Sequence, residues 1–340
     1  MYYVGCDLHK EHTWFYVVDK SGKKVLSKNI SNKPETLEEF FKTLPVPFEL
    51  AVESTYNWYF FVDIAEQYAQ QVYLANSYEL KAFAKRHKKT DKIDVRLIAN
   101  VLSKGYLPTV TIPDKNTRNT KELLRYRMNI VKDRSRNIVR LKTLLDKLGE
   151  ESMGDFNTYK RLESIPLAHF DENYNKIISG YIQRICFLKK MLFESDKIII
   201  KTALKDTDIL NLRTIPGLEY FSASLIKSEI IDINRFASFS RLCAYADLAP
   251  RVSQSANKTS YGPLNINRRK NLQWILLEVV CHFIKAIPEK NNLYKILSKT
   301  KGSNTAKVIM ARFLLKIVYH VLKEKRSFIR KTNEMFQHAA

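Results

Sequence analysis

The stretch MYYVGCDLH, residues 1–9, places a carboxylate inside an otherwise apolar strand. Strand side chains alternate between two faces, so one face collects Val4, Cys6 and Leu8 and the other collects Tyr3, Gly5 and Asp7. Burying an aspartate is costly unless its charge is compensated, and a divalent cation compensates it well. An aspartate that caps a turn at the strand end is the alternative, and this stretch alone leaves both interpretations open.

The composition is that of a folded protein without a membrane segment. Its 340 residues suffice for two or three domains, and 45% hydrophobic with 27% charged residues is ordinary for such a chain. No apolar run approaches the roughly 18–20 residues of a membrane span, and the N-terminus lacks a signal-peptide pattern. We therefore expect a cytoplasmic protein with no membrane partner. The four cysteines lack metal-ligand spacing and are interpreted as reduced core residues.

Positive charge is concentrated in the later part of the chain. Lys and Arg number 57 against 35 Asp and Glu, which gives a net charge of +22. Residues 1–115 hold 16 basic and 14 acidic side chains, whereas residues 116–340 hold 41 and 21. A membrane surface or an acidic protein could bind such a surplus, but an extended polyanion, nucleic acid, fits it better.

The N-terminal third alternates strands with helices. We expect strands at residues 1–9, 12–19, 24–30, 48–55 and 71–76, and helices at 34–44, 58–70, 78–86 and 92–104. Three consecutive strands followed by helix–strand crossovers are the connectivity of an RNase H-type sheet. Residues 1–115 are thus predicted to form an α/β domain of this type.

Residues 116–205 are predicted to form two long helices. The first, 116–148, has an apolar seam of Leu124, Met128, Val131, Ser135, Ile138, Leu141, Leu145 and Leu148. The second, 172–203, has a stripe of Ile177, Ile178, Tyr181, Ile185, Leu188 and Leu192. Cations cover the other faces of the first helix, namely Arg118, Lys121, Arg125, Arg127, Lys132, Arg134, Arg136 and Arg140. A hairpin within one chain and an intermolecular coiled coil both fit, and the cations form either a solvated surface or a nucleic-acid contact.

Residues 206–325 are predicted to form an all-α domain, with helices at 239–247, 269–287 and 303–323, before a basic tail at 326–340. Residues 210–231 resemble a helix-hairpin-helix, in which a tight turn at Pro216–Gly217 presents N–H groups to phosphate. Glu219 stands where the second glycine of such hairpins is expected, so a plain helical corner fits equally well.

Three further carboxylates are predicted to join Asp7. Glu53 follows the apolar run of the fourth strand and would lie beside Asp7, while Asp91 and Asp94 share one face of a helix. Four such carboxylates are tolerable only with cations bound, typically two Mg²⁺, with Mn²⁺ as a substitute. An acidic helix start that favours the macrodipole is the alternative for Asp91. Five cations precede or begin this helix and would lead a phosphate backbone to the acids: Lys85, Arg86, Lys88, Lys89 and Lys92.

Small hydroxyls and cations form a second group in APRVSQSANKTSYGPLNINRRKNLQW, residues 249–274. Ser253 and Ser255 are placed in a loop, and the cations that would grip a nucleic-acid backbone are Arg251, Lys258, Arg268, Arg269 and Lys270. A serine in this setting either hydrogen-bonds a phosphate or attacks phosphorus and holds the strand as a phosphoserine ester. Chemistry alone favours the first role, because no adjacent general base is visible in the sequence.

Six segments that span nearly the whole chain carry a family resemblance. They are VGCDLHKEHTWFYVVD (4–19), VEST (52–55), KTDKIDVRLIA (89–99), RTIPGLEYFSASLIKSEI (213–230), FASFSRLCAYADLAPRVSQSANK (236–258) and LQWILLEVV (272–280). Together they resemble the DEDD transposases of the insertion-sequence one-ten family, which are related to Piv-type DNA invertases. The KTDKIDVRLIA and AYADLAPRVSQS stretches are the specific part of this likeness.

The resemblance implies a RuvC-like N-terminal domain, a coiled-coil middle and a C-terminal transposase domain. It implies that Asp7, Glu53, Asp91 and Asp94 bind Mg²⁺ and that Ser255 is the nucleophile that forms a covalent 5′-phosphoserine. It further implies a multimer, a dimer or tetramer assembled through the helical region, in which acids and serine from different subunits complete one site. Donor and target DNA would be selected by a non-coding guide RNA.

Three positions depart from the family pattern. Ala256 follows the serine where glycine is expected, and Asp247 replaces the glycine of the AYxGL stretch. Residues 265–271, NINRRKN, replace a Thr–Lys–x–Gly–Asn segment. These changes bear on the backbone of the serine segment and on the level of activity, and they leave Ser253 as a second candidate nucleophile.

We therefore expect a transposase or site-specific recombinase that cuts and rejoins DNA through serine attack assisted by Mg²⁺. One alternative is a nuclease of the Holliday-junction-resolvase kind, in which the acids activate water and no covalent intermediate forms. The other alternative is a non-catalytic scaffold that binds nucleic acid. The products separate the three, because recombination rejoins ends, hydrolysis leaves them free and a scaffold leaves DNA unaltered.

Overall fold

A six-stranded mixed sheet forms the first of two units into which the chain divides, Met1–Pro113 and Asp114–Ala340. The computed structural model describes residues 1–80, 91–150, 156, 162–165, 170–249, 251–255, 258–262 and 270–329. Within these ranges it describes only the backbone of residues 91–93, 251–255, 258–262 and 270. None of the described helices is long and apolar enough to cross a membrane.

The sheet has the strand order β3-β2-β1-β4-β5-β6. The strands β1 (Tyr2–Leu8), β2 (His12–Asp19) and β3 (Lys24–Ser31) form an antiparallel meander, as the sequence predicts. β4 (Phe48–Glu53) runs parallel to β1, and β5 (Gln71–Ala75) runs parallel to β4. The two-residue strand β6 (Thr109–Val110) pairs antiparallel with β5 and is too short to leave a pattern in the sequence.

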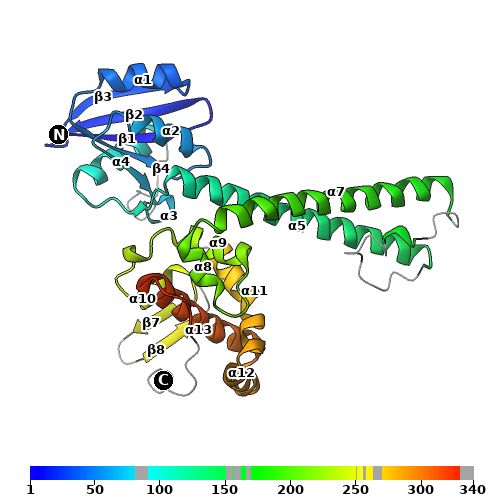
Figure 1. The fold of residues 1–340 in the computed structure, drawn as a ribbon. Coiled ribbons are helices and arrows are strands. Elements are labelled where there is room, and N and C mark those ends of the chain that lie inside the picture. Colours follow the sequence, from blue (N-terminus) through cyan, green and yellow to red (C-terminus); the bar gives the residue numbers. More distant parts are fainter. Residues whose placement is uncertain are drawn as a thin grey trace. The chain divides into compact units, whose positions relative to one another are not determined.

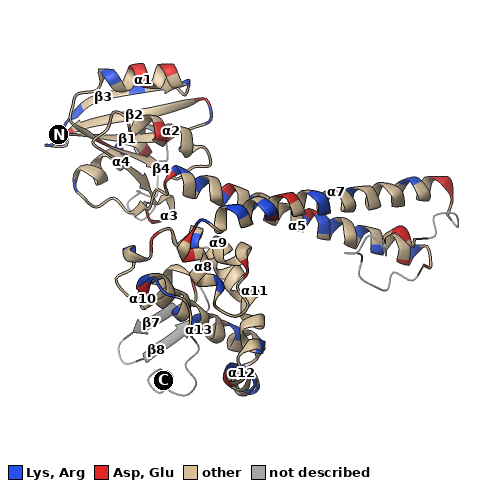
Figure 2. Ribbon diagram, viewed as in Figure 1, with Lys and Arg blue, Asp and Glu red and all other residues tan. Residues whose placement is uncertain are grey.

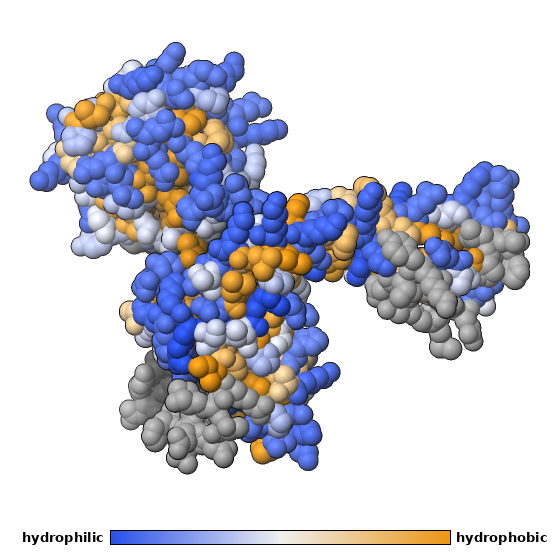
Figure 3. All heavy atoms as spheres, in the orientation of Figure 1, coloured by the Kyte–Doolittle hydropathy of each residue, from blue (hydrophilic) through white to orange (hydrophobic). Residues whose placement is uncertain are grey.

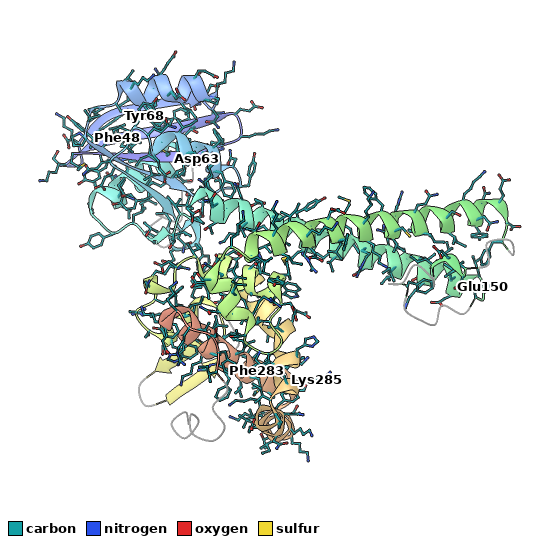
Figure 4. The ribbon with its side chains drawn as sticks, in the orientation of Figure 1. Phe48, Asp63, Tyr68, Glu150, Phe283 and Lys285 are labelled. Carbon is teal, nitrogen blue, oxygen red and sulfur yellow. The ribbon has the colours of Figure 1, made fainter. Side chains whose placement is uncertain are left out.

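The helices α1 (Pro34–Thr43) and α2 (Trp58–Ala65) pack into a core with the side chains of one sheet face. This core takes Val4, Cys6 and Leu8 from β1, as the alternation of the first strand predicts. Aromatic rings fill it, with centroids 5.8 Å apart for Phe15 and Phe41 and 5.9 Å apart for Phe41 and Phe61. Phe48 and Tyr68, labelled in Figure 4, belong to the same layer.

The helix α4 (Asp91–Ser103) packs on the other face of the sheet (Figure 1). It crosses β1 at Gly5, where an added Cβ would lie 2.4 Å from the Val95 carbonyl oxygen and 2.7 Å from the Ala99 nitrogen. Ala51 of β4 forms a small core with Ile98 and Leu102 of α4 on this face. The first unit is therefore a three-layer α/β sandwich. A short helix, α3 (Ser77–Leu80), covers the start of the helix predicted at 78–86, and the remainder of that prediction lies outside the described residues.

Two long helices, α5 (Lys115–Lys147) and α7 (Glu172–Ala203), pack antiparallel within one chain (Figure 1). The start of α5 and the end of α7 share a core through Leu124, Met128, Ile199 and Ala203. The far ends of the two helices meet through Leu141, Leu145, Ile178 and Ile185. The hairpin alternative is thus observed, but Ser135 of the predicted seam and Ile177 of the predicted stripe are exposed.

Two of the cations that the sequence placed on the faces of α5 away from its apolar seam are buried. Arg118 and Lys121 lie near the start of the helix, where α9 (Tyr220–Ile230) packs against it, and Lys121 contacts Glu229. The prediction that these two side chains lie on an exposed face was wrong. The apolar pattern of α5 indicates the side that packs on α7, but it does not show that α9 covers another side at the start of the helix. Further along the hairpin, positions of Lys and Arg alternate with positions of Asp and Glu on both helices (Figure 2).

The C-terminal part of the second unit is mainly helical. It contains α8 (Thr207–Arg213), α9, the 3₁₀ turn Ile233–Arg235, α10 (Phe239–Tyr245), α11 (Lys270–Ala286), α12 (Pro288–Lys301) and α13 (Ser303–Glu324). Phe283 of α11 is fully buried in its core, whereas Lys285 is exposed (Figure 4). The helix α12 was not predicted. The prediction of an all-α domain was also wrong, because β7 (Arg251–Ser255) and β8 (Lys258–Gly262) form a two-stranded antiparallel sheet.

The corner between α8 and α9 is held by packing against another helix. Gly217 has a φ of +89°, and an added Cβ would lie 2.9 Å from the backbone nitrogen of Phe283. Glu219 is the N-cap residue of α9 and forms a capping box with Ser222. The turn therefore packs on α11, and its glycine serves that close approach.

The Gly5 contact predicts a large effect of one methyl group. Gly5→Ala should lower the free energy of unfolding by about 1–3 kcal/mol, because its Cβ would overlap backbone atoms of α4 that side-chain motion cannot displace. Gly180→Ala in α7 is the control, since nothing lies within 4 Å of its Cβ position. That variant should gain up to about 1 kcal/mol from helix propensity. Urea denaturation followed by circular dichroism measures both, and an unchanged Gly5→Ala protein would contradict the close approach.

A half-buried carboxylate in the first turn of α8, paired with a lysine at the end of α13, predicts a dependence of stability on pH. Burial alone would raise the pKa of Asp208, but Lys325 and Lys227, at 2.9 Å and 3.2 Å, together hold it below its ordinary value. A lowered folded-state pKa contributes stability above the unfolded pKa of about 3.9, and this contribution is lost as the pH falls through the folded pKa. Asp208→Asn should therefore be less stable than the parent at pH 7, with a difference that shrinks below about pH 4. A difference that stays constant down to pH 2 would exclude this pairing.

Candidate active site

Asp7 and Glu53 lie on neighbouring strands at the carboxyl ends of β1 and β4. The parallel register pairs Gly5 with Ala51 and Cys6 with Val52, which brings Asp7 and Glu53 to adjacent positions. Neighbouring strands are about 4.8 Å apart, so the two Cα atoms are separated by roughly that distance. By alternation both side chains belong to the sheet face that α4 covers, the face of Gly5 and Ala51.

The start of α4 lies level with these two acids. Gly5 is against Val95 and Ala99, while Tyr3, two residues earlier on β1, packs with Ile98 and Leu102. Moving along β1 from Tyr3 toward Asp7 therefore corresponds to moving along α4 toward its N-terminus. Two strand residues span about 7 Å, the rise of four or five helical residues, so the backbone level with Asp7 is that of residues 92–93. Asp91 and Asp94 flank this level, and we call Asp7, Glu53, Asp91 and Asp94 the acidic edge.

The four carboxylates are described to different depths. Asp7, Glu53 and Asp94 are all partly buried, whereas the side chain of Asp91 lies outside the described residues. Among the described side chains, no group of three His, Cys, Asp or Glu residues is arranged to hold a metal ion. The donor set of the acidic edge consists of carboxylate oxygens, which are the ligands that Mg²⁺ and Mn²⁺ prefer.

A polar network that sequence reasoning missed adjoins the acidic edge. His9 Nε2 lies 3.2 Å from Asp7 Oδ2. The His9 carbonyl oxygen accepts hydrogen bonds from the side-chain amides of Asn32 at 2.9 Å and Asn57 at 2.8 Å. In the sequence, only the i, i+2 spacing of Asp7 and His9 pointed to this network. Asn32 and Asn57 lie 23 and 48 residues from His9, so no local pattern connects them to it.

Ser255 ends β7 and pairs with Lys258, the first residue of β8. Ser253 pairs with Ser260, two positions back on the same strand. Both serines thus belong to a β-hairpin and not to the predicted loop. The sequence did not reveal it because the two strands, RVSQS and KTSYG, lack an apolar alternation.

A buried clamp joins the two ends of the segment that carries these serines. Gln273, buried in the first turns of α11, donates its side-chain amide to the Asp247 carbonyl oxygen at 2.8 Å. Asp247 itself has a φ of +53°, a conformation that aspartate tolerates better than most residues and that suits the glycine expected there. The clamp holds residues 247 and 273 together at the base of the hairpin segment.

A buried ion pair anchors the same region to the long hairpin. Glu229 Oε2 lies 3.3 Å from Lys121 Nζ of α5, and its Oε1 accepts a hydrogen bond from Asn271 of α11 at 3.2 Å. Tyr245 donates its hydroxyl to the Glu229 carbonyl oxygen at 3.1 Å. One glutamate therefore ties α5, α9, α10 and α11 together next to the segment of Ser255.

The ten basic residues predicted to grip nucleic acid fall on parts of the chain that are not described at side-chain level. Lys85, Arg86, Lys88, Lys89, Arg268 and Arg269 lie outside the described residues. The backbone places Lys92 in α4, Arg251 in β7, Lys258 in β8 and Lys270 at the start of α11. Their role stays a prediction.

Two family models match the chain, and each covers one of the two candidate regions. The DEDD_Tnp_IS110 transposase model matches residues 4–149, which include the acidic edge. The model of the transposase IS116/IS110/IS902 family matches residues 210–295, which include Ser255 and its clamp.

Two curated proteins are similar over most of the chain. The transposase for insertion sequence element IS1328 of Yersinia enterocolitica is 25% identical over 276 residues, 81% of this chain and 81% of that protein. The transposase for insertion sequence element IS1111A of Coxiella burnetii is 24% identical over 270 residues, 75% of this chain and 72% of that protein.

The clamp at the base of the serine segment predicts a cost for removing one amide. Gln273→Leu should lower the free energy of unfolding by about 1–3 kcal/mol, because the Asp247 carbonyl loses the amide that it accepts from. Lys285→Ala is the control, an exposed position on the same helix that should change stability by less than about 0.5 kcal/mol. Urea denaturation gives both values, and equal stability of the two variants would show that the clamp contributes nothing.

Proposed function

Since the chain belongs to the IS110 family of transposases, an enzyme family that cleaves and rejoins DNA, we propose that it does so through a covalent 5′-phosphoserine at Ser255. The observation that carries the proposal is the adjacent placement of Asp7 and Glu53, one residue beyond the last pair of the β1–β4 register and level with the start of α4. Carboxylates in this arrangement serve phosphoryl transfer, and a serine among cations supplies the nucleophile.

The serine step conserves the phosphodiester bond. The Ser255 hydroxyl oxygen forms a bond to phosphorus, the bond from phosphorus to the 3′ oxygen breaks, and the serine proton is passed to that leaving oxygen through solvent. A 3′ hydroxyl from another strand then attacks the phosphoserine and releases Ser255. Because each bond broken is replaced by one of the same kind, the reaction needs no external energy source.

The acidic edge would hold divalent metal. The DEDD transposase domain implies dependence on divalent metal in general, and we propose Mg²⁺, two ions to a site, with Mn²⁺ able to replace it. Asp7 and Glu53 would be its ligands from the sheet, and Asp91 and Asp94 its ligands from α4. When bound, these ions would neutralise charge on the phosphate oxygens. The four carboxylates would hold the ions in position, and the positive charge of the ions would offset the repulsion among the carboxylates.

The first unit would be a RuvC-like domain. Its meander β3-β2-β1, extended by the parallel strands β4 and β5, supports this assignment, and so does the position of the acids at the strand ends. The acids and Ser255 lie in different units of the chain. We propose that subunits of a homo-oligomer, a dimer or tetramer, contribute acids and serine to one composite site.

The long hairpin is the proposed oligomerisation element, as a coiled coil between copies. On α7 the side chains of Phe187 and Phe193 are 62% and 59% exposed, and Figure 3 shows apolar residues among hydrophilic ones along this part of the molecule. Exposed aromatic side chains at such density favour a protein partner.

Nucleic acid is the partner that the charge favours. The family implies a DNA substrate, and the excess of 22 positive charges suits a polyanion. We propose that a non-coding guide RNA selects donor and target DNA, bound by the basic residues that flank α4 and the serine hairpin.

A covalent-trapping gel tests the nucleophile. The protein, co-expressed with the DNA that flanks its gene, is mixed with end-labelled element-junction DNA and Mg²⁺ and run under denaturing conditions. The parent should form a slow protein–DNA band that Ser255→Ala reduces about a thousand-fold or more, since no other group makes the ester. Ser253→Ala is the matched control on the same strand and should keep the band.

The variant Asp7→Ala completes the test. It should abolish strand cleavage while leaving DNA binding in a mobility-shift assay nearly unchanged, because the acid acts on the reaction and the cations bind the backbone. Cleavage that persists in Ser255→Ala without an adduct would replace the proposal by a nuclease that uses water. Loss of DNA binding together with cleavage in Asp7→Ala would remove the assigned role of the acid.

A further inference from the structure

The backbone of His9 is held by two side-chain amides from different loops. Asn32 directly follows β3 and Asn57 directly precedes α2, and both donate to the His9 carbonyl oxygen. The His9 nitrogen donates to the carbonyl oxygen of His12 at 3.0 Å, so both backbone groups of His9 are bonded. Three connections, from β1, β3 and β4, thus converge two residues beyond Asp7.

Each amide is itself oriented by a hydroxyl. Thr13 donates to Asn32 Oδ1 at 2.5 Å, and Thr55 donates to Asn57 Oδ1 at 2.9 Å. Because a hydroxyl occupies the oxygen of each amide, the NH₂ group is directed to His9. Thr13 is fully buried, which makes this network costly to leave partly satisfied.

The imidazole ring of His9 is restrained as well. Its Nε2 atom is shielded from solvent and lies 3.2 Å from Asp7 Oδ2, a charge contact without hydrogen-bond geometry, although the side chain as a whole is 39% exposed. The ring of His12 lies with its centroid 5.1 Å away, at an interplanar angle of 34°. The ring is therefore positioned against one oxygen of the Asp7 carboxylate.

We propose that His9 is a positioning residue for Asp7, held in place by Asn32 and Asn57. It keeps one carboxylate oxygen directed along the sheet edge, so that the other is presented to a divalent cation. Groups that orient a ligating carboxylate typically contribute 10–100-fold to metal affinity. This inference rests on the proposed role of the acidic edge, and it adds residues that neither the family likeness nor the sequence pattern assigned.

Mn²⁺ binding to the full chain, measured by isothermal titration calorimetry at one pH, tests the proposal. His9→Ala should weaken Mn²⁺ affinity by about 10–100-fold, and His9→Gln should recover much of it because an amide N–H can lie against the same carboxylate oxygen. The matched control is His320→Ala in α13. His320 also lies against a carboxylate, 3.0 Å from Glu324 Oε1, and is 49% exposed, but it is remote in sequence from the acidic edge. It should bind Mn²⁺ as the parent does.

A second variant keeps the test decisive if His9→Ala fails to fold. Asn57→Ala leaves the ring and Asp7 intact and removes one of the two amides that hold the His9 carbonyl. It should weaken Mn²⁺ binding by a smaller factor than His9→Ala, with its unfolding curve recorded in parallel. A loss of stability without any change in Mn²⁺ affinity would mean that the network serves the fold alone.

Asp7→Asn separates failure of this inference from failure of the proposed function. If Asp7→Asn loses Mn²⁺ binding while His9→Ala and Asn57→Ala bind as the parent does, the positioning role is wrong and the acidic edge stands. If Asp7→Asn itself binds Mn²⁺ as the parent does, the acidic edge is not the metal site and both are wrong. Loss in Asp7→Asn with graded losses in His9→Ala and Asn57→Ala supports the proposal.

Discussion

The close approach of α4 to β1 at Gly5 is the contact on which the first unit depends. Without a side chain at this position, the backbone of the helix lies against the strand, and the first turn of α4 is carried to the level of Asp7. A larger residue would push the helix away from the acids as well as loosen the core. Gly5 therefore affects the site through packing. The close contact of α4 with β1 sets the distance between the carboxylates of the helix and those of the sheet.

The polar groups of the candidate site lie near this contact, at the carboxyl ends of β1 and β4. Asp7 and Glu53 face the layer of α4, while the amides of Asn32 and Asn57 bind the chain just beyond Asp7. The opposite sheet face is filled with aromatic and aliphatic side chains and is sealed by α1 and α2. This asymmetry lets one sheet face supply stability while carboxylates and amides occupy the carboxyl edge of the strands.

In the second unit, a short polar β-hairpin is attached to a helical core. Strands as short as β7 and β8 are marginal alone, so their ends must be held by the surrounding helices. Gln273 binds the Asp247 carbonyl at the base of the segment, and Glu229 joins α9 to Asn271 and to Lys121 of the long hairpin. Buried polar contacts thus join the helices on either side of the hairpin segment to α5.

The sequence by itself determined the alternation of the first strand, the order of the first five strands with α1, α2 and α4, and the acids that lie at the strand ends. It did so because period and turn chemistry are local, and because a recognisable motif surrounds each acid. Tertiary structure alone decided that α5 and α7 pair within one chain, that Lys121 is buried on Glu229, and that RVSQS and KTSYG form a hairpin. It also decided that Asn32 and Asn57 meet at His9, two contacts across 23 and 48 residues. These features depend on which distant surfaces are buried together, and no pattern within a single segment carries that information.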